Sequence, residues 1–202
     1  MIVSEKGAVA ALKKAFDKGY EIEPFAGGRI SIYTGNWALQ TNTRELPLAV
    51  SQILVDHYGG IPVEPMMVRK GKAKQQMICG LDQDRAGGLL LMQENPNYMR
   101  RIPVTFRDKW DMFVKDTGEW MCLDRQYLDI LDQTRPYSVM MTEEGMAMFS
   151  LGDEQLTVAP GEFGTDDRMK LQRIAEMYMK QELHEVVEPE NMSLFDMEDE
   201  DE

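Results

Sequence analysis

Residues 137–158, YSVMMTEEGMAMFSLGDEQLTV, contain the pattern that decides the fold. Apolar and polar side chains alternate over Tyr137–Met141, Met146–Ser150 and Gln155–Val158, which is the period of a half-buried β-strand. Glu143-Glu144-Gly145 and Gly152-Asp153 interrupt this alternation with residues that favour tight turns. The stretch therefore predicts three antiparallel strands connected as a meander.

A second stretch of the same kind lies nearer the N-terminus. Strand-like segments occur at 20–25, 29–33 and 37–40, and they are separated by Gly27-Gly28 and by Thr34-Gly35-Asn36. Both separators consist of turn-forming residues. We therefore expect a second antiparallel meander.

Segments with helical periodicity surround the two meanders. Ser4 is a candidate N-cap for a helix that ends at Gly19, and further helices are expected at 45–58 and 166–186. The remaining expected elements are strands at 63–69, 75–80 and 89–93, a short helix at 107–115 and helical structure at 120–131. The predicted fold class is α+β, with two antiparallel β-meanders packed against three or four helices.

The acidic charge is concentrated in the last third of the chain. The 202 residues have a formal net charge of −13, yet residues 1–135 contain 18 basic and 17 acidic side chains. Residues 188–202 contain eight acids and no base. Like charges at this density repel one another, so we expect a disordered acidic tail at 188–202 after a compact α+β domain at 1–187. A subdivision of that domain near 95–118 is left open.

The motifs expected of an enzyme are missing from the sequence. There is no phosphate-binding loop, no dinucleotide-binding turn, no nucleophile elbow and no zinc-binding HExxH. The two cysteines, Cys79 and Cys122, lie far apart, and His57 falls on the apolar face of a helix. We therefore expect a non-enzymatic protein with no cofactor and no metal. No signal peptide or membrane span is recognisable, which predicts a cytoplasmic protein.

Basic residues form two groups that could contact phosphates. Arg69, Lys70, Lys72 and Lys74 lie at the tip of an expected hairpin, 69–74. The second group comprises Arg100, Arg101, Arg107 and Lys109. The hairpin at 69–74 lacks the interleaved aromatic residues that single-strand binders use, and ordinary solvated surface is the favoured interpretation of these groups.

A short apolar motif lies inside the acidic tail: Asn191-Met192-Ser193-Leu194-Phe195. A solvated tail gains no solubility from a Leu-Phe pair, so the pair suggests a linear docking motif of moderate affinity. The segment resembles the motif by which bacterial replication and repair proteins bind the sliding clamp, commonly written Gln-Leu-Ser/Asp-Leu-Phe. Ser193, Leu194 and Phe195 match this pattern and Met192 is an apolar substitute, whereas Asn191 is one methylene shorter than the Gln.

The same motif is compatible with two further roles. Leu194 and Phe195 could pack back onto the body as a C-terminal strap, or they could dock onto a different protein partner. The favoured hypothesis is an interaction protein, encoded by a phage or mobile element, that engages nucleic-acid machinery such as the sliding clamp through its tail.

Two alternative functions follow from the placement of charge. The first is an acidic DNA mimic that inhibits a defence nuclease, as anti-CRISPR and anti-restriction proteins do. Its candidate carboxylates on ordered structure are Glu143, Glu144, Asp153, Glu154, Asp166 and Asp167. The second is a DNA-binding accessory protein that uses the basic hairpin at 69–74.

Overall fold

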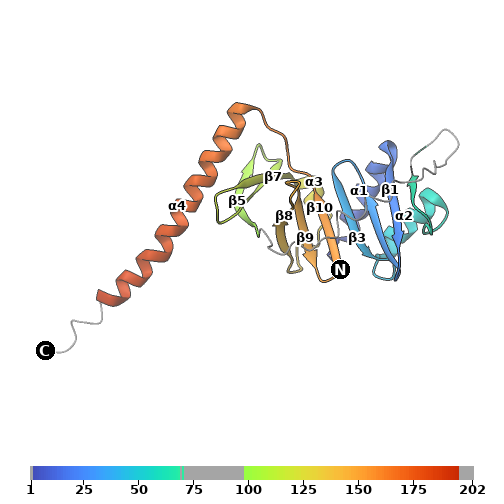
Figure 1. Cartoon of the computed structure of the whole chain (residues 1–202), viewed down its shortest axis with the longest axis horizontal. Helices are drawn as coiled ribbons and strands as arrows, with labels where there is room; N and C mark the ends of the chain where they lie inside the picture. Colours follow the sequence, from blue (N-terminus) through green and yellow to red (C-terminus); the bar gives the residue numbers. More distant parts are fainter. Residues whose placement is uncertain (1, 69, 71–97, 196–202) are drawn as a thin grey trace.

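The computed structural model describes residues 2–68, 70 and 98–195, with residues 181–195 described at the level of the backbone. They form an α+β fold with two antiparallel sheets and four helices (Figure 1). The helices are α1 (Glu5–Lys18), α2 (Leu48–Tyr58), α3 (Arg125–Leu128) and α4 (Thr165–Phe195). The strands are β1 (Tyr20–Phe25), β2 (Arg29–Tyr33), β3 (Trp37–Asn42), β4 (Met66–Val68), β5 (Arg100–Phe106), β6 (Trp110–Val114), β7 (Trp120–Asp124), β8 (Ser138–Met141), β9 (Ala147–Leu151) and β10 (Glu154–Val158).

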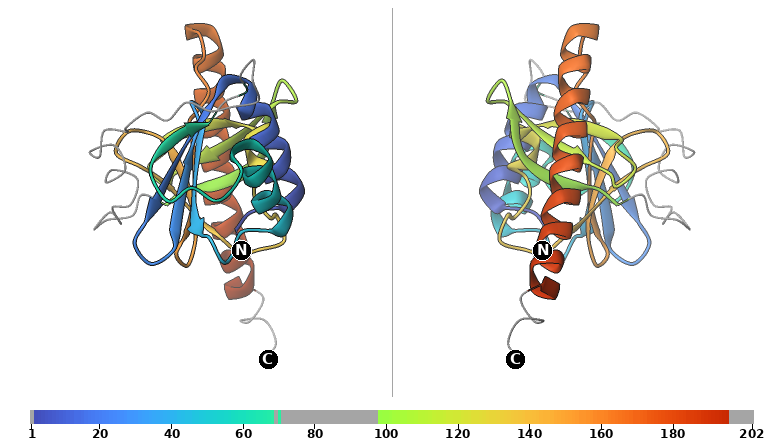
Figure 2. Two further views of the ribbon diagram at one scale, coloured as in Figure 1. Left: turned by 90° about the vertical axis from the view of Figure 1, so that its right-hand side faces the viewer. Right: turned by 90° about the vertical axis from the view of Figure 1, so that its left-hand side faces the viewer.

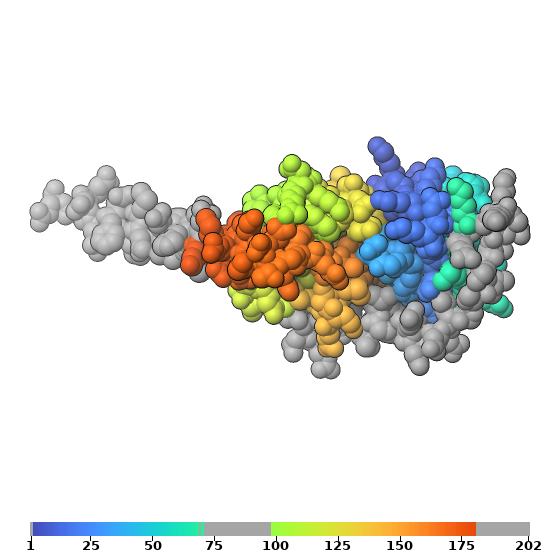
Figure 3. Space-filling view, turned by 90° about the horizontal axis from the view of Figure 1, so that it is seen from above, coloured from blue at the N-terminus to red at the C-terminus, as the bar shows by residue number. Residues whose placement is uncertain are grey.

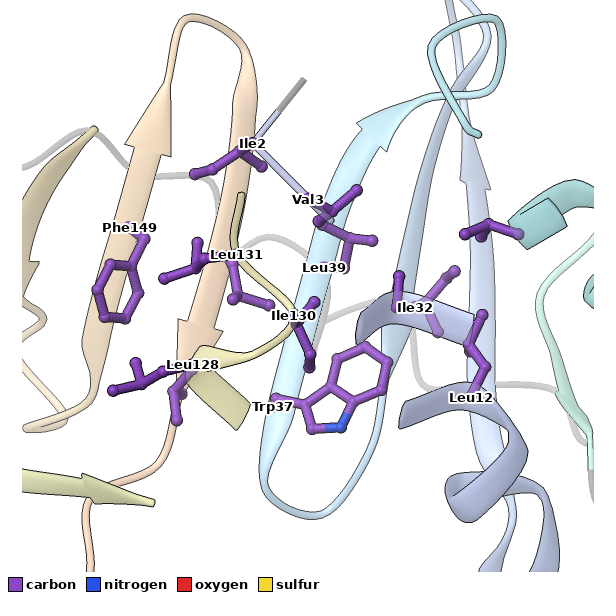
Figure 4. Packing of buried hydrophobic residues seen from close by; sticks show 14 of the residues in the cluster. Ile2, Val3, Leu12, Ile32, Trp37, Leu39, Leu128, Ile130, Leu131 and Phe149 are labelled. Atoms are coloured by element: carbon purple, nitrogen blue, oxygen red, sulfur yellow. The ribbon is translucent and has the colours of Figure 1, made fainter. Parts of the chain in front are cut away.

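Both predicted meanders are confirmed, and they join into one sheet. The seven strands follow the order β4-β1-β2-β3-β10-β9-β8. The junction is the antiparallel pair β3 and β10, in which Leu156 faces Leu39 and Val158 faces Trp37. All four side chains are buried, so the two meanders share a continuous core (Figure 4).

Helices α1 and α2 cover the β1–β4 half of this sheet (Figure 2). The side chain of Ser4 caps α1 by accepting a hydrogen bond from the Gly7 N–H, and Gly19 follows the last residue, as the sequence predicts. Helix α2 begins at Leu48, later than the expected Glu45, because Pro47 occupies the position before the first turn. Each helix buries one face, which includes Leu12 in α1 and Leu54 in α2.

The second sheet, with the order β5-β6-β7, was not predicted. The expected helix at 107–115 is wrong, because Arg107–Lys109 form the turn of a β-hairpin between β5 and β6. Arg107 and Asp108 have φ angles of 51° and 52°. Two consecutive left-handed residues are typical of a type I′ hairpin turn, which usually contains Asn and Gly. The sequence Arg-Asp does not indicate such a turn.

The expected helical structure at 120–131 is also largely wrong, since β7 occupies 120–124 and α3 only Arg125–Leu128. Both faces of the three-stranded sheet are buried, and its side chains alternate between two hydrophobic clusters. Phe113, Met121 and Leu123 belong to the cluster beneath the seven-stranded sheet, whereas Met112 and Cys122 face α4. Because neighbouring residues of β6 and β7 are buried on opposite faces, these strands contain runs of consecutive apolar residues. Such runs hide the two-residue period of a strand in the sequence.

Helix α4 covers the outer face of the three-stranded sheet (Figure 3). Leu171 and Ala175 are fully buried there, and Ile174, Tyr178 and Met179 pack around them. The helix continues beyond the expected end at Val186 to Phe195, so the expected start of the tail at Glu188 lies inside it. Glu, Met and Leu are good helix formers, and this local preference opposes the charge repulsion used to predict disorder.

Some predicted elements lie outside the described residues. They are the strands expected at 75–80 and 89–93 and the final residues of the tail, 196–202. The strand expected at 63–69 is observed as the shorter β4, which pairs with β1.

Close packing of α1 against the chain after α3 makes a sharp test of the fold. A Cβ atom on Gly7 would lie 1.7 Å from the backbone oxygen of Asp129. We expect Gly7→Ala to destabilise the protein by about 1–3 kcal/mol in urea unfolding because the backbones must separate. A Gly→Ala change inside an unobstructed helix stabilises by about 1 kcal/mol instead, so the sign of the effect is diagnostic.

Gly35→Ala is the matched control, because nothing lies within 4 Å of a Cβ built at Gly35. An unchanged or increased free energy of unfolding for Gly7→Ala would contradict this close packing of α1.

Candidate functional site

A cluster of charged side chains lies at one end of the three-stranded sheet. The carboxylate of Asp111, on β6, accepts hydrogen bonds from Arg101 Nη2 at 2.5 Å and from Arg125 Nε at 2.9 Å. The hydroxyl of Thr105 faces Asp111 across the strand pair, donates to its carboxylate at 3.2 Å and accepts from Arg125 Nη2 at 2.6 Å. Two arginines and one threonine thus surround a single carboxylate.

The carboxylate is buried and the two arginines are partly exposed. The side chain of Asp111 is 3% exposed, whereas those of Arg101 and Arg125 are 43% and 47% exposed. Removal of a cationic partner from a buried carboxylate costs about 3–5 kcal/mol, so the carboxylate of Asp111 requires these contacts in the folded state. Both arginine side chains thus keep a large exposed fraction beside the buried carboxylate.

A second buried carboxylate, that of Asp124, lies at the end of β7. Its side chain is 6% exposed and pairs with Lys109 Nζ at 3.0 Å. Gln126 Nε2 donates to the same carboxylate at 2.8 Å, and Gln126 Oε1 accepts from Lys14 of α1. Lys109 Nζ also lies 4.5 Å from the centre of the Trp110 ring. These contacts hold the lysine on the β5–β6 hairpin in place.

The second predicted basic group is only partly brought together. Arg101 and Lys109 lie at the two buried carboxylates, and Arg107 Nη2 contacts both carboxylate oxygens of Asp167 on α4, at 2.8 and 2.7 Å. Arg100 points to the other face, where Nη2 lies 3.3 Å from the sulfur of Met179.

Asp111, Asp124 and Arg125 lie at the centre of these contacts and were not predicted from the sequence as site residues. The sequence does contain a pattern that indicates these residues. Asp111 and Asp124 each lie in an apolar stretch, and Asp124 directly precedes Arg125. An acid inside an apolar strand needs a cation nearby, which makes the neighbouring arginine a candidate partner.

The basic hairpin predicted at 69–74 lies almost entirely outside the described residues. Arg69, Lys72 and Lys74 are not described, and Lys70 is exposed. The Lys70 Nζ lies 3.4 Å from a carboxylate oxygen of Asp17 at the end of α1. The phosphate contacts proposed for this hairpin therefore stay a prediction.

The candidate carboxylates for DNA mimicry do not form one array. Glu143 and Glu144 are exposed in the turn before β9, whereas Asp153 is exposed in the turn after β9. The strand between these turns is five residues long, which separates them by about 17 Å. Asp166 is exposed at the start of α4, and Asp167 pairs with Arg107.

Glu154 was predicted as one of these candidate carboxylates, and the structure contradicts this prediction. It is 4% exposed and accepts hydrogen bonds from the Ile2 backbone N–H at 2.5 Å and from the Thr41 hydroxyl at 2.8 Å. Its side chain joins the N-terminal segment to the sheet. It is not available to a partner.

The tail motif, Asn191–Phe195, forms the C-terminal end of α4. Its backbone is helical and projects beyond the two sheets (Figure 1). The contacts of its side chains lie outside the described part of the chain, so its role as a docking motif stays a prediction.

A small, shallow hollow that is open to solvent lies on the seven-stranded sheet. Ser31, Tyr33, Gln40, Gln155 and Thr157 contribute polar side chains to it. Gln40 is 5% exposed, and neither atom of its amide has a hydrogen-bond partner among the described residues. A hollow of this kind is suited to an ordered water that bonds the amide.

Cys122 does not have the properties of a nucleophile. It lies in the cluster between the three-stranded sheet and α4, and burial raises the pKa of its thiol to about 12. The thiol is therefore protonated near neutral pH. Across residues 2–68, 70 and 98–180, no three His, Cys, Asp or Glu side chains are grouped as metal ligands.

His57 is packed among aromatic residues at the end of α2. Its ring stacks on Phe16 with 3.7 Å between ring centres, and Nδ1 lies 2.9 Å from the Tyr20 hydroxyl. Burial lowers the pKa of His57; neighbouring Asp56 opposes this shift and Lys13 adds to it. The structural role favoured by its position on an apolar helix face agrees with these contacts.

The chain matches no family model, no curated protein and no solved structure. Among the described residues, no helix combines the length and the apolar composition needed to cross a membrane. Function must therefore be inferred from the charged cluster, the acidic residues and the end of α4.

The packing of His57 predicts a pH dependence of stability. Because folding lowers the pKa of His57 below its ordinary value of 6.5, the folded state binds this proton less readily than the unfolded state. Its contribution to stability is complete above pH 6.5 and is lost as the pH falls from there through the folded pKa. Urea unfolding at roughly pH 7.5 and pH 5 should show a smaller pH-dependent loss for His57→Gln than for the unmodified chain.

The variant also loses packing contacts, but that loss lowers its free energy of unfolding equally at both pH values. It therefore cancels when the change in this free energy between the two pH values is compared for the two chains. Equal pH-dependent losses in both chains would show that His57 titrates with the same pKa in the folded and unfolded states.

Proposed function

We propose that this protein is an interaction protein that docks onto the bacterial sliding clamp, or a similar component of the nucleic-acid machinery, through Asn191–Phe195. The observation that carries the proposal is the course of α4. Among the side chains that the structure describes, the last to pack on the three-stranded sheet are Tyr178 and Met179, and the backbone of the helix continues to Phe195. At 1.5 Å per residue, the twelve residues from Met179 to Asn191 extend roughly 18 Å. This length supports presentation of the motif away from the body.

The course of the helix also argues against the strap. For Leu194 and Phe195 to pack onto the body, the chain would have to reverse direction between Met179 and Leu194. A continuous helix over this span does not reverse direction (Figure 1). A strap needs the end of this helix both to unwind and to turn back along α4, whereas outward docking needs only the unwinding, so outward docking is favoured.

Docking requires the last turns of the helix to unwind. Leu194 and Phe195 are adjacent, so in a helix their side chains diverge by about 100° and do not share one contact surface. Pro189 has no backbone N–H and destabilises the helix interior around it. The final turn of α4 has no basic residue to interact with the helix dipole. Unwinding after Pro189 consequently costs little free energy.

A moderate and reversible affinity is expected. Burial of Leu194 and Phe195 contributes about 1.5–3 kcal/mol each, and part of this gain is lost when the segment becomes ordered on the partner. The acids around the motif favour a partner with a positive rim, and they make association faster at low salt. Cytoplasmic location and an origin in a phage or mobile element belong to the same proposal.

Replacing both Leu194 and Phe195 with Ala should abolish binding to a purified bacterial sliding clamp. Surface plasmon resonance with the full chain measures the affinity, and a loss of at least roughly tenfold is expected from the two apolar side chains. Thermal unfolding measured on the same samples should stay unchanged, because outward docking leaves the folded body intact.

Met197→Ala is the matched control, since it truncates an apolar residue of the same acidic segment outside the motif. It should bind as the unmodified chain does. A large loss of thermal stability in the double variant would instead support the strap, and clamp binding that survives the double variant rules out this docking mode.

A further inference from the structure

We propose that Arg101 and Arg125, positioned by the buried carboxylate of Asp111, bind phosphate groups of a nucleic-acid backbone. This site is separate from the tail motif, and it differs from the basic hairpin at 69–74. The three residues come from β5, α3 and β6, and Asp111 contacts both arginines at hydrogen-bond distance.

The cluster around Asp111 carries an excess of positive charge. One guanidinium group is sufficient to neutralise one buried carboxylate, and it can do so through two parallel hydrogen bonds. Here two guanidinium groups share the carboxylate of Asp111. The cluster therefore keeps one positive charge in excess, and this charge lies on the two half-exposed arginines.

Both arginines also keep hydrogen-bond donors for a ligand. Each guanidinium group has five N–H donors. Within the described residues, Arg101 uses Nη2 for Asp111 and Nη1 for Gln133 at 3.5 Å, and Arg125 uses Nε for Asp111 and Nη2 for Thr105. The side chains are 43% and 47% exposed, so the remaining donors can reach a ligand.

The two guanidinium groups are ordered before any ligand arrives. A free arginine side chain loses considerable rotamer entropy when it binds a ligand. The contacts to Asp111, Thr105 and Gln133 have already ordered these two side chains in the folded protein. Binding of an anion therefore requires little further ordering, which favours affinity.

Neighbouring cations indicate a polyanion instead of a single free phosphate. Lys109 is held by Asp124, and Lys14 reaches the same position through Gln126. Cations supplied by β5, the β5–β6 hairpin, α1 and α3 can contact successive phosphates of one strand. No base-reading element is implied, so binding should be independent of sequence and sensitive to salt.

The test measures binding of the full chain to a short fluorescent DNA strand, and to the same DNA as a duplex, by anisotropy at several salt concentrations. Arg101→Gln and Arg125→Gln should each weaken binding. Each should also reduce the slope of log affinity against log salt by roughly 0.7 for the single strand or 0.9 for the duplex. A purely structural role for the arginines would leave this slope unchanged.

Arg135→Gln is the matched control. Arg135 is 58% exposed and lies 3.7 Å from Asp132, outside the cluster. Arg101→Lys and Arg125→Lys serve as second variants, because they keep a cation beside Asp111 if the Gln variants unfold. Loss of the planar fork should weaken DNA binding in the Lys variants while the salt slope is retained.

Slopes that match the Arg135→Gln control, or absence of DNA binding by the unmodified chain at low salt, would falsify the proposal. Binding of inorganic phosphate without binding of either DNA would overturn the assignment to nucleic acid. The clamp measurement uses a different partner and different residues, so the failure of one proposal is distinguishable from the failure of the other.

Discussion

The pairing of β3 with β10 is the interaction on which the rest of the structure depends. It joins residues more than a hundred positions apart, Leu39 and Leu156 among them, and it converts two small meanders into one seven-stranded sheet. The chain between β3 and β10 includes the whole second sheet, so this sheet lies within the long connection that the pairing closes. The entropy of closing such a long loop must be offset by the shared core, so we expect this pairing to form late in folding.

The three-stranded sheet lies between two hydrophobic clusters, and this position explains the chemistry at its end. Side chains of β6 and β7 alternate between the large core and α4, so polar residues within these strands have few places to reach solvent. Asp111 and Asp124 lie at the end of this sheet, where cations from neighbouring elements cover their carboxylates. The arginines and the lysine are thereby ordered at the surface because the acids are buried beneath them.

The sequence predicts the outer elements better than the middle layer. Alternation is intact in β1 and β2, and Gly27-Gly28, Gly145 and Gly152 mark the turns of the two meanders, so both meanders are recognisable. The middle layer is not recognisable, because burial on both faces removes the alternation and Arg107-Asp108 forms a turn without glycine. This error hid part of the charged cluster as well. Once 107–115 is interpreted as a helix, Asp111 has no reason to face Arg101 and Arg125. Glu154 shows a different error, since an acid proposed to face a partner is buried within the sheet.

The way α4 is attached has a practical consequence for shortening the chain. Among the described side chains of α4, Leu171 and Ala175 are fully buried, and they cover Ile102, Met112, Val114 and Cys122 of the three-stranded sheet. A cut, whether engineered or proteolytic, that removes the helix before Met179 would uncover an apolar sheet face of the kind that drives aggregation. Loss of solubility in such a fragment would therefore report the exposure of this face and not the loss of a partner. A cut after Met179 retains all of these contacts and separates the two effects.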